Sequence, residues 1–219
     1  MRQFAVIGLG NFGYHLATHL SAKGHEVMAM DRNVNRIQAI KDLVSQAVVV
    51  DATDRETLET LGLREMDTVV VSIGTEMTNS ILVTLNLKDM GCKRVLAMAI
   101  SDDHGRILEK VGATEVLFPE KDLGISLAEK LHNPNMLEYL PFTPDYSIIE
   151  LAPPKAFIGK ALRELDLINR FGVQVVAIKE LIPDRVNMIP TGNFVVKDSD
   201  ILVLLGPNKS LDKLRERES

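Results

Sequence analysis

Short apolar runs alternate with polar, helix-favouring segments throughout the first 118 residues of the chain. The runs are four to six residues long and rich in Val and Ile, a pattern typical of strands that are buried on both faces of a sheet. They are Phe4–Gly8, Glu26–Met30, Ala47–Val50, Thr68–Ile73, Arg94–Ala99 and Glu115–Phe118. Strands and helices in strict turn form βαβ units, whose strands are parallel. The alternation therefore predicts an α/β fold with a doubly wound parallel sheet of six strands.

The prolines divide the chain into two regions. All nine lie at or beyond Pro119, and five of them fall between Pro134 and Pro154. Proline lacks a backbone donor and fixes φ, so a proline cluster suits a connector better than a helix or central strand. We therefore predict a first domain over 1–133, a linker over 134–146 and a smaller α+β domain over 147–219. The second domain's expected strands are Ser147–Leu151, Val173–Lys179, Val186–Ile189 and Ile201–Leu205, with helices near Lys160–Glu164 and Ser210–Arg217.

A glycine-rich loop, Gly8-Leu9-Gly10-Asn11-Phe12-Gly13, joins the first expected strand to the first expected helix. Gly8 permits a tight turn, Gly10 lets a pyrophosphate approach the backbone, and Gly13 allows close packing of the helix on the strand. Free N–H groups at the start of the helix would then face phosphates. The pattern is weak alone, but its place between a strand and a helix favours a nucleotide site.

An acidic residue lies at the end of the second expected strand, where a nucleotide-binding glycine loop requires one. Asp31 ends the second expected strand, 23 residues after Gly8, close to the separation found in dinucleotide-binding folds. Its carboxylate can accept hydrogen bonds from both hydroxyls of an adenosine ribose and would repel a 2′-phosphate. The positive charge of Arg32, the next residue, weakens this exclusion of a 2′-phosphate. We therefore expect a nucleotide with a free 2′-hydroxyl rather than NADP.

Two more polar segments follow strands, Asp51-Ala52-Thr53 after the third and Ser72-Ile73-Gly74 after the fourth. Ligands of open α/β sheets bind at the carboxyl ends of the strands, so both segments are candidates for the same site. Asp51 and Thr53 suit N-caps of the helix that starts near Asp54 equally well, and the sequence leaves both alternatives open.

The catalytic groups of an enzyme are scarce. Residues 133–219 contain no histidine and no cysteine, and neither Tyr139 nor Tyr146 has a lysine four residues on, as short-chain dehydrogenases require. His15 and His19 lie four residues apart but lack the glutamate of a zinc-protease helix, so we expect a solvated face there. We predict a nucleotide sensor that is not an enzyme, with an NAD-dependent oxidoreductase as the alternative.

Composition excludes several other classes. The formal net charge is −5, which disfavours nucleic acid as a partner, and no apolar run approaches the ~20 residues of a membrane-spanning helix. The single cysteine, Cys92, suggests a reducing compartment. A redox-sensing transcription factor would need a basic helix-turn-helix, for which there is no room before the first strand. We expect a soluble, cytoplasmic protein.

Seven stretches of the sequence together match a known family: 4–13 (FAVIGLGNFG), 24–31 (GHEVMAMD), 48–54 (VVVDATD), 108–113 (LEKVGA), 119–124 (PEKDLG), 146–151 (YSIIEL) and 200–206. Through them the sequence resembles the cytoplasmic RCK (KTN) regulatory subunits of the Ktr and Trk bacterial potassium uptake systems, with Ktr the closer branch. The resemblance extends over essentially the whole chain.

The resemblance implies a Rossmann-like N-terminal lobe that binds an adenine nucleotide (ATP, ADP, AMP or NAD(H)) and a TrkA-C type C-terminal lobe. It implies homodimers that assemble into a ring of eight chains, and no membrane insertion of the chain itself. The ring would dock on the inner face of the membrane, on a separate potassium channel subunit of the KtrB or TrkH type. Nucleotide exchange would reshape the ring and gate potassium flux.

Residue by residue, the resemblance implies a nucleotide site and a cation site beside it. The implied nucleotide contacts are Gly8, Gly10, Asn11, Phe12, Gly13, Asp31, Arg32, Asp51, Ala52, Thr53, Ile73 and Gly74. Glu120 matches the glutamate of a site for a divalent cation (Mg²⁺ or Ca²⁺) near the phosphates at a subunit interface. The alternative for Glu120 is an acid that favours the start of a helix.

Three positions depart from the family pattern. Asn11 stands where Ktr subunits commonly have arginine, and Met98 stands where they commonly have lysine. Because a charge-assisted hydrogen bond contributes about 1.5–3 kcal/mol, we expect a weakened preference for ATP over ADP, AMP and NAD(H). Some family members bind cyclic di-AMP between paired C-terminal lobes, where an expected arginine is replaced by Ile168. That ligand is a weaker expectation.

Overall fold

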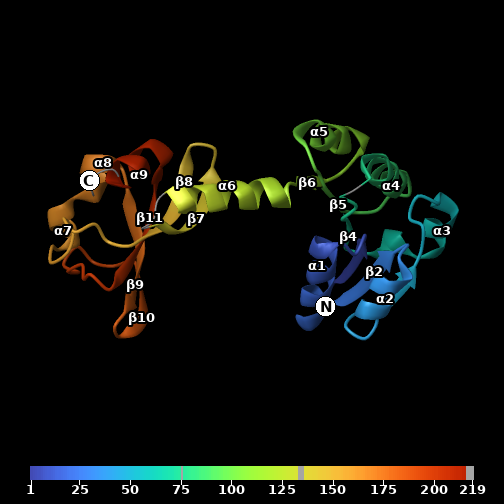
Figure 1. Cartoon of the computed structure of the whole chain (residues 1–219), viewed down its shortest axis with the longest axis horizontal. Coiled ribbons are helices and arrows are strands. Elements are labelled where there is room, and N and C mark those ends of the chain that lie inside the picture. Colours follow the sequence, from blue (N-terminus) through green and yellow to red (C-terminus); the bar gives the residue numbers. More distant parts are fainter. Residues whose placement is uncertain (75, 133–135, 216–219) are drawn as a thin grey trace. The chain divides into compact units, whose positions relative to one another are not determined.

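A computed structural model describes residues 1–74, 76–132 and 136–215 of the chain. The chain forms two compact units, residues 1–120 and 121–219, which are described here one at a time (Figure 1). The division falls in the first turn of helix α6 (Pro119–His132), upstream of the predicted linker.

The first unit contains a six-stranded parallel sheet with the strand order β3-β2-β1-β4-β5-β6. Its strands are β1 (Gln3–Ile7), β2 (Glu26–Asp31), β3 (Gln46–Val49), β4 (Thr68–Val71), β5 (Val95–Met98) and β6 (Glu115–Leu117). Its helices are α1 (Asn11–Ala22), α2 (Val34–Ile40), α3 (Arg55–Thr60), a 3₁₀ turn (Leu63–Glu65), α4 (Met77–Asp89) and α5 (Asp102–Val111). The prediction of a doubly wound parallel sheet is confirmed, and β1 lies at the point where the strand order changes direction.

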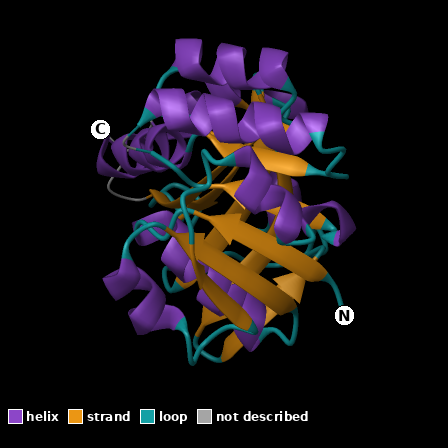
Figure 2. Cartoon of the chain, turned by 90° about the vertical axis from the view of Figure 1, so that its right-hand side faces the viewer, coloured by secondary structure: helices purple, strands orange, loops and turns teal. Residues whose placement is uncertain are grey.

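Both faces of this sheet are covered, which explains its continuous apolar strands. Successive residues of β1 point to opposite faces, so Ala5 and Ile7 belong to one buried cluster and Val6 belongs to another. Side chains of α3, α4 and α5 complete the first cluster, and side chains of α1 and α2 complete the second. Figure 2 faces this unit and shows its strands side by side among the helices.

The glycine loop between β1 and α1 is packed against the sheet. Gly8 has φ +93°, a left-handed conformation that strongly favours glycine. Gly13 lies so close to this turn that a Cβ on it would be 2.0 Å from the carbonyl oxygen of Gly8. A Cβ on Gly10 would instead have no heavy atom within 4 Å. The loop therefore has no room for a side chain at Gly13, on its inner side, but has free space at Gly10, on its outer side.

The second unit contains a five-stranded antiparallel sheet with the order β10-β9-β11-β8-β7. Its elements after α6 are β7 (Met136–Thr143), β8 (Tyr146–Leu151), α7 (Leu162–Leu165), α8 (Leu167–Phe171), β9 (Gln174–Leu181), β10 (Asp184–Met188), β11 (Asp200–Pro207) and α9 (Asn208–Arg215). Buried and half-buried residues alternate along β11, as expected of a sheet with one face on a core. The predicted α+β lobe is confirmed, and the last two residues of the helix predicted to end at Arg217 lie outside the described part.

The predicted linker differs from the structure. Met136–Thr143 forms the edge strand β7, which pairs with β8 in antiparallel register. Pro141 lies opposite Ser147, next to a register shift. A proline is tolerated here because an edge strand does not need every N–H for its ladder. Residues 133–135 of the predicted linker lie outside the described residues.

The glycine loop yields a prediction about stability. Gly13→Ala should lower the free energy of unfolding by about 1–3 kcal/mol, because the new methyl group meets the backbone of Gly8. Gly10→Ala is the matched control and should change it by less than about 1 kcal/mol, since its backbone is extended with φ −65° and its Cβ has free space. Urea unfolding followed by circular dichroism measures both values. Equal stability of the two variants would contradict the packing described here.

Candidate functional site

A cleft of about 920 Å³ opens at the carboxyl ends of the strands of the first unit. It contains all the predicted nucleotide contacts except one, together with the predicted cation ligand: Gly8, Gly10, Asn11, Phe12, Asp31, Arg32, Asp51, Ala52, Thr53, Ile73, Gly74 and Glu120. Gly13 does not line the cleft, because it packs beneath the loop against Gly8. The cleft volume is at the upper end of the range for small-molecule sites.

The start of α1 presents backbone donors to this cleft. Gly10 is the N-cap residue of α1, and no side chain caps the first turn. The first N–H groups of a helix have no partner within the helix and carry a partial positive charge. Open space on the outer side of Gly10 lets a ligand reach these donors. This arrangement fits the phosphates of a nucleotide.

The carboxylate of Asp31 is more buried, and makes more hydrogen bonds within the protein, than the sequence suggested. Its side chain is only 5% exposed. Its Oδ2 accepts hydrogen bonds from the backbone N–H of Leu9 at 2.7 Å and from Arg36 Nη1 at 3.1 Å, and its Oδ1 accepts one from the N–H of Asn33 at 2.8 Å. A carboxylate has about four acceptor positions. About one is left for a ribose, whereas the sequence predicted bonds to both hydroxyls.

The structure shows which residue caps the helix that follows β3. The N-cap of α3 is Asp54, whose carboxylate accepts a hydrogen bond from the N–H of Glu56 at 3.2 Å. Asp51 Oδ1 instead accepts bonds from the hydroxyl and the N–H of Thr53, at 2.7 and 2.9 Å. These bonds, aided by the charge of Arg32, lower the pKa of Asp51. Asp51 thus stays ionised and fixes a turn in the wall of the cleft.

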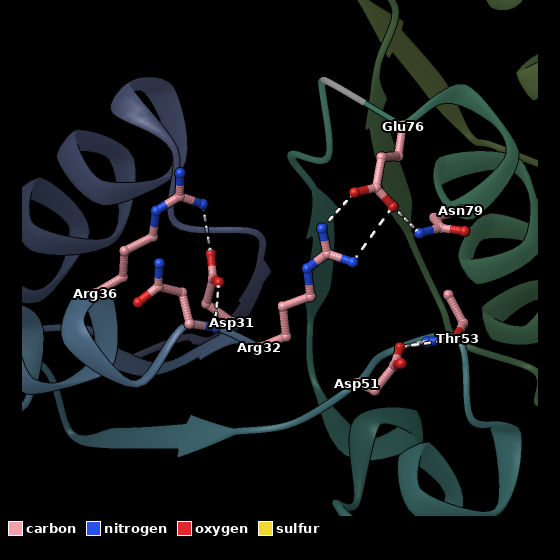
Figure 3. A network of polar contacts seen from close by, with 8 residues as sticks. Asp31, Arg32, Arg36, Asp51, Thr53, Glu76 and Asn79 are labelled. Atoms are coloured by element: carbon pink, nitrogen blue, oxygen red, sulfur yellow. Dashed lines mark hydrogen bonds and ion pairs between the residues drawn. The ribbon is translucent and has the colours of Figure 1, made fainter.

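An ion pair connects the two sides of the cleft. The Arg32 guanidinium donates to both carboxylate oxygens of Glu76, and the longer contact, from Nη1 to Oε2, is 3.4 Å. Glu76 Oε2 also accepts a hydrogen bond from the side-chain amide of Asn79. Arg32 follows β2 and Glu76 precedes α4, so the pair joins segments on opposite sides of β1 (Figure 3).

Part of the cleft lining is apolar. Met98, Ile100 and Pro119 contribute to it, at and beyond the end of β5 and at the start of α6. The Met98 methyl group lies 2.6 Å from the position that a Cβ on Gly74 would occupy, so its side chain packs over this glycine. At the floor, the hydroxyl of Ser72 is buried and has no hydrogen-bond partner among the described residues. This hydroxyl lies 3.1 Å from the position that a Cβ on Gly13 would occupy, beneath the glycine loop.

The residues considered as metal ligands all lie at the cleft. Glu120 is exposed in the first turn of α6 and lines the cleft. His15 and His19, expected on a solvated face, are exposed but also line the cleft. Within the described residues, no group of three or more His, Cys, Asp and Glu side chains is arranged to hold a metal ion.

Sequence reasoning missed three charged or polar side chains of the site: Arg36, Glu76 and Asn79. A signal was present for Glu76, which follows β4 just beyond Gly74 and so had to lie near the carboxyl edge of the sheet. Arg36 and Asn79 lie inside helices, and nothing in their spacing indicates that they reach back toward the cleft.

In the second unit, an isoleucine occupies the position where the resemblance implied an arginine, and a nearby arginine contacts its own helical turn. Ile168 is exposed on α8. Nearby, the Arg170 guanidinium carbon lies 5.3 Å from the centre of the Phe171 ring, and Nη1 donates to the carbonyl of Leu165 at 3.3 Å. Arg170 is thus folded onto its own turn.

The fold and the cleft define a class of protein, one with a Rossmann-like domain of the nucleotide-binding type and a small antiparallel second unit. The sequence matches the TrkA-N domain over residues 4–119 and the TrkA-C domain over residues 146–218. It is 35% identical over 216 residues to the Ktr system potassium uptake protein C of Bacillus subtilis (strain 168), covering 99% of this chain and 97% of that protein. It is 34% identical over 210 residues to the Ktr system potassium uptake protein A of Vibrio alginolyticus, covering 96% and 94%.

A solved structure shares the fold over the whole chain. The GsuK channel bound to NAD aligns with a TM-score of 0.70 and 17% identity, over 100% of this chain and 39% of that chain. The chain therefore belongs to the family of potassium uptake proteins that combine a TrkA-N with a TrkA-C domain. The resemblance seen in the sequence is confirmed.

The contacts of Asp31 predict a stability effect that needs no ligand. Asp31→Ala should lower the free energy of unfolding by about 1–3 kcal/mol, because the buried N–H of Leu9 loses its acceptor. Asp51→Ala removes a carboxylate from an exposed turn and should lower it by less than about 1 kcal/mol. Urea unfolding of nucleotide-free protein distinguishes the two variants, and an Asp31→Ala variant as stable as the parent would contradict the anchoring role.

Proposed function

We propose that this chain is a regulatory subunit of a potassium uptake system, in which an adenine nucleotide bound in the first unit controls a separate membrane channel subunit. The observation that carries the proposal is the cleft at the end of β1, where an uncapped helix start, an open glycine and an acidic strand end come together. The relatives support it, because two of them are named Ktr system potassium uptake proteins. GsuK, which shares the fold, is described as bound to NAD.

Each part of the cleft has a role in this proposal. The N–H groups of Asn11 and Phe12 hold the phosphates at the start of α1. The remaining acceptor position of Asp31 takes one ribose hydroxyl, and Ala52 and Ile73 flank the adenosine. Glu120 stands at the rim, where a divalent cation bound to the phosphates would meet it.

The proposal places the membrane channel in another polypeptide. Among the described residues, no helix is both long and apolar enough to span a bilayer. We propose that copies of the chain assemble into a ring that docks on the channel subunit. Nucleotides can change such a ring only through different affinities for its two states.

Regulation is favoured over the alternative of an NAD-dependent oxidoreductase. The chain covers nearly the full length of relatives that are named for potassium uptake rather than for a reaction. Residues 133–219 contain no histidine or cysteine to serve as an acid or base. Steady oxidation of NADH by the purified chain with a small carbonyl substrate would favour the enzyme instead.

Potassium uptake in cells tests the proposal directly. Cells without their own uptake systems should take up potassium faster when they express a Ktr-type channel subunit together with this chain than with the channel subunit alone. Gly10→Ala should abolish most of the gain, because its methyl group fills the space where phosphates approach the backbone. Uptake that is identical with and without the chain would contradict the proposed function.

Calorimetric titration tests the expected nucleotide preference. Because Asn11 and Met98 supply no cation to a terminal phosphate, ATP should bind less than tenfold more tightly than ADP and NADH. The titrations use the purified chain after removal of any bound nucleotide. An ATP preference of tenfold or more over both other nucleotides would show that other groups replace the missing cations.

A further inference from the structure

One face of helix α1 carries a row of exposed polar side chains. Asn11, His15 and His19 follow one another at intervals of four residues, and all three are exposed. The opposite side of the helix is fixed to the first unit, because Gly13 and Ala17 are buried there. The row is therefore held in place by the packing of its helix while its side chains reach solvent.

The two histidines of this row are free to bind a ligand. Within the described part of the chain, neither imidazole has a hydrogen bond or an ion pair. The ring of His15 stands at 89° to the ring of Tyr14, and their centroids are 5.5 Å apart. Tyr14 is half-buried, so this edge contact restricts the positions that the His15 ring can take.

The spacing of the histidines suits a shared metal ion. Residues four apart on a helix are neighbours on one face, with their Cβ atoms about 5–6 Å apart. The two histidines of a zinc-protease helix have this spacing and bind one Zn²⁺ between them. The glutamate that this chain lacks is the general base of the protease and not a metal ligand. Its absence therefore argues against peptide hydrolysis and not against a metal ion.

A shallow hollow beside α1 adds a negative charge to the pair. It is lined by His15, His19 and Asp42, together with smaller contributions from α1 and from the turn after α2. Asp42 is exposed, and it has no ion pair or hydrogen bond among the described residues. The three side chains are not arranged as a complete three-ligand group. The carboxylate thus attracts a cation to the hollow, and the two imidazoles supply its ligands.

We propose that His15 and His19 form a binding site for one divalent transition-metal ion of the Zn²⁺, Ni²⁺ and Cu²⁺ class, with water at its remaining positions. Imidazole nitrogen suits these ions, whereas Mg²⁺ and Ca²⁺ prefer oxygen ligands. The site therefore differs, in its residues and in its ion, from the cation site expected at Glu120. It goes beyond the proposed function, because it needs no bound nucleotide.

Calorimetric titration with Zn²⁺ tests the site in the purified chain from which bound nucleotide has been removed. The parent should bind one Zn²⁺ per chain with an affinity that depends on both histidines, and excess Mg²⁺ should not displace it. His15→Gln and His19→Gln should each weaken binding tenfold or more, because even the loss of an outer-shell partner of a metal ligand costs 10–100-fold. Circular dichroism verifies that the variants fold.

Thermal unfolding gives a second readout. Zn²⁺ should raise the unfolding temperature of the parent, because the folded helix presents both imidazoles to one ion and the unfolded chain does not. It should not raise the unfolding temperature of His15→Gln or His19→Gln.

Two control variants distinguish this site from adventitious zinc. His132→Gln removes an exposed histidine of α6, and Cys92→Ser removes the single, half-buried thiol of the chain. Both should leave the Zn²⁺ affinity unchanged. Zn²⁺ binding that is equal in the parent, His15→Gln and His19→Gln, or that is lost in either control variant, would overturn the proposal.

Discussion

The buried carboxylate of Asp31 holds together the parts of the first unit on which the cleft depends. Its bond to the N–H of Leu9 fixes the glycine loop, its bond to Asn33 fixes the entry to α2, and its contact with Arg36 ties that helix to the end of β2. Bonds to a charged group in a poorly solvated position are strong, and leaving their donors unpaired is costly. The same residue that a ligand would use is thus also a structural anchor, and its capacity for ribose is correspondingly reduced.

The same anchor also affects the charges of the cleft. Arg36 is bound to Asp31, whose carboxylate is buried, whereas Arg32 pairs with the partly exposed Glu76 across the end of β1. The two ion pairs of the cleft lining therefore differ in their exposure to solvent.

The sequence predicted the framework well and the polar contacts poorly, for identifiable reasons. Strand–helix alternation was enough for the six-stranded sheet, because parallel strands covered on both faces must be apolar throughout. The glycine loop and Asp31 were placed correctly, because their spacing follows from the geometry of a βαβ unit. The strand β7 was missed, because edge strands tolerate the prolines that suggested a linker. The Arg32–Glu76 pair was missed, because it joins residues 44 positions apart through side-chain rotamers that no local pattern specifies.

The central claim is that the cleft of the first unit holds an adenine nucleotide. Mass spectrometry of the small molecules released when the chain is purified without added ligand and then denatured tests this most directly. The account predicts a stoichiometric adenine nucleotide in the released fraction, and its loss in Gly10→Ala protein that is still folded. A chain that releases no nucleotide, and that binds none of ATP, ADP, AMP and NAD(H) when they are added afterwards, would contradict it.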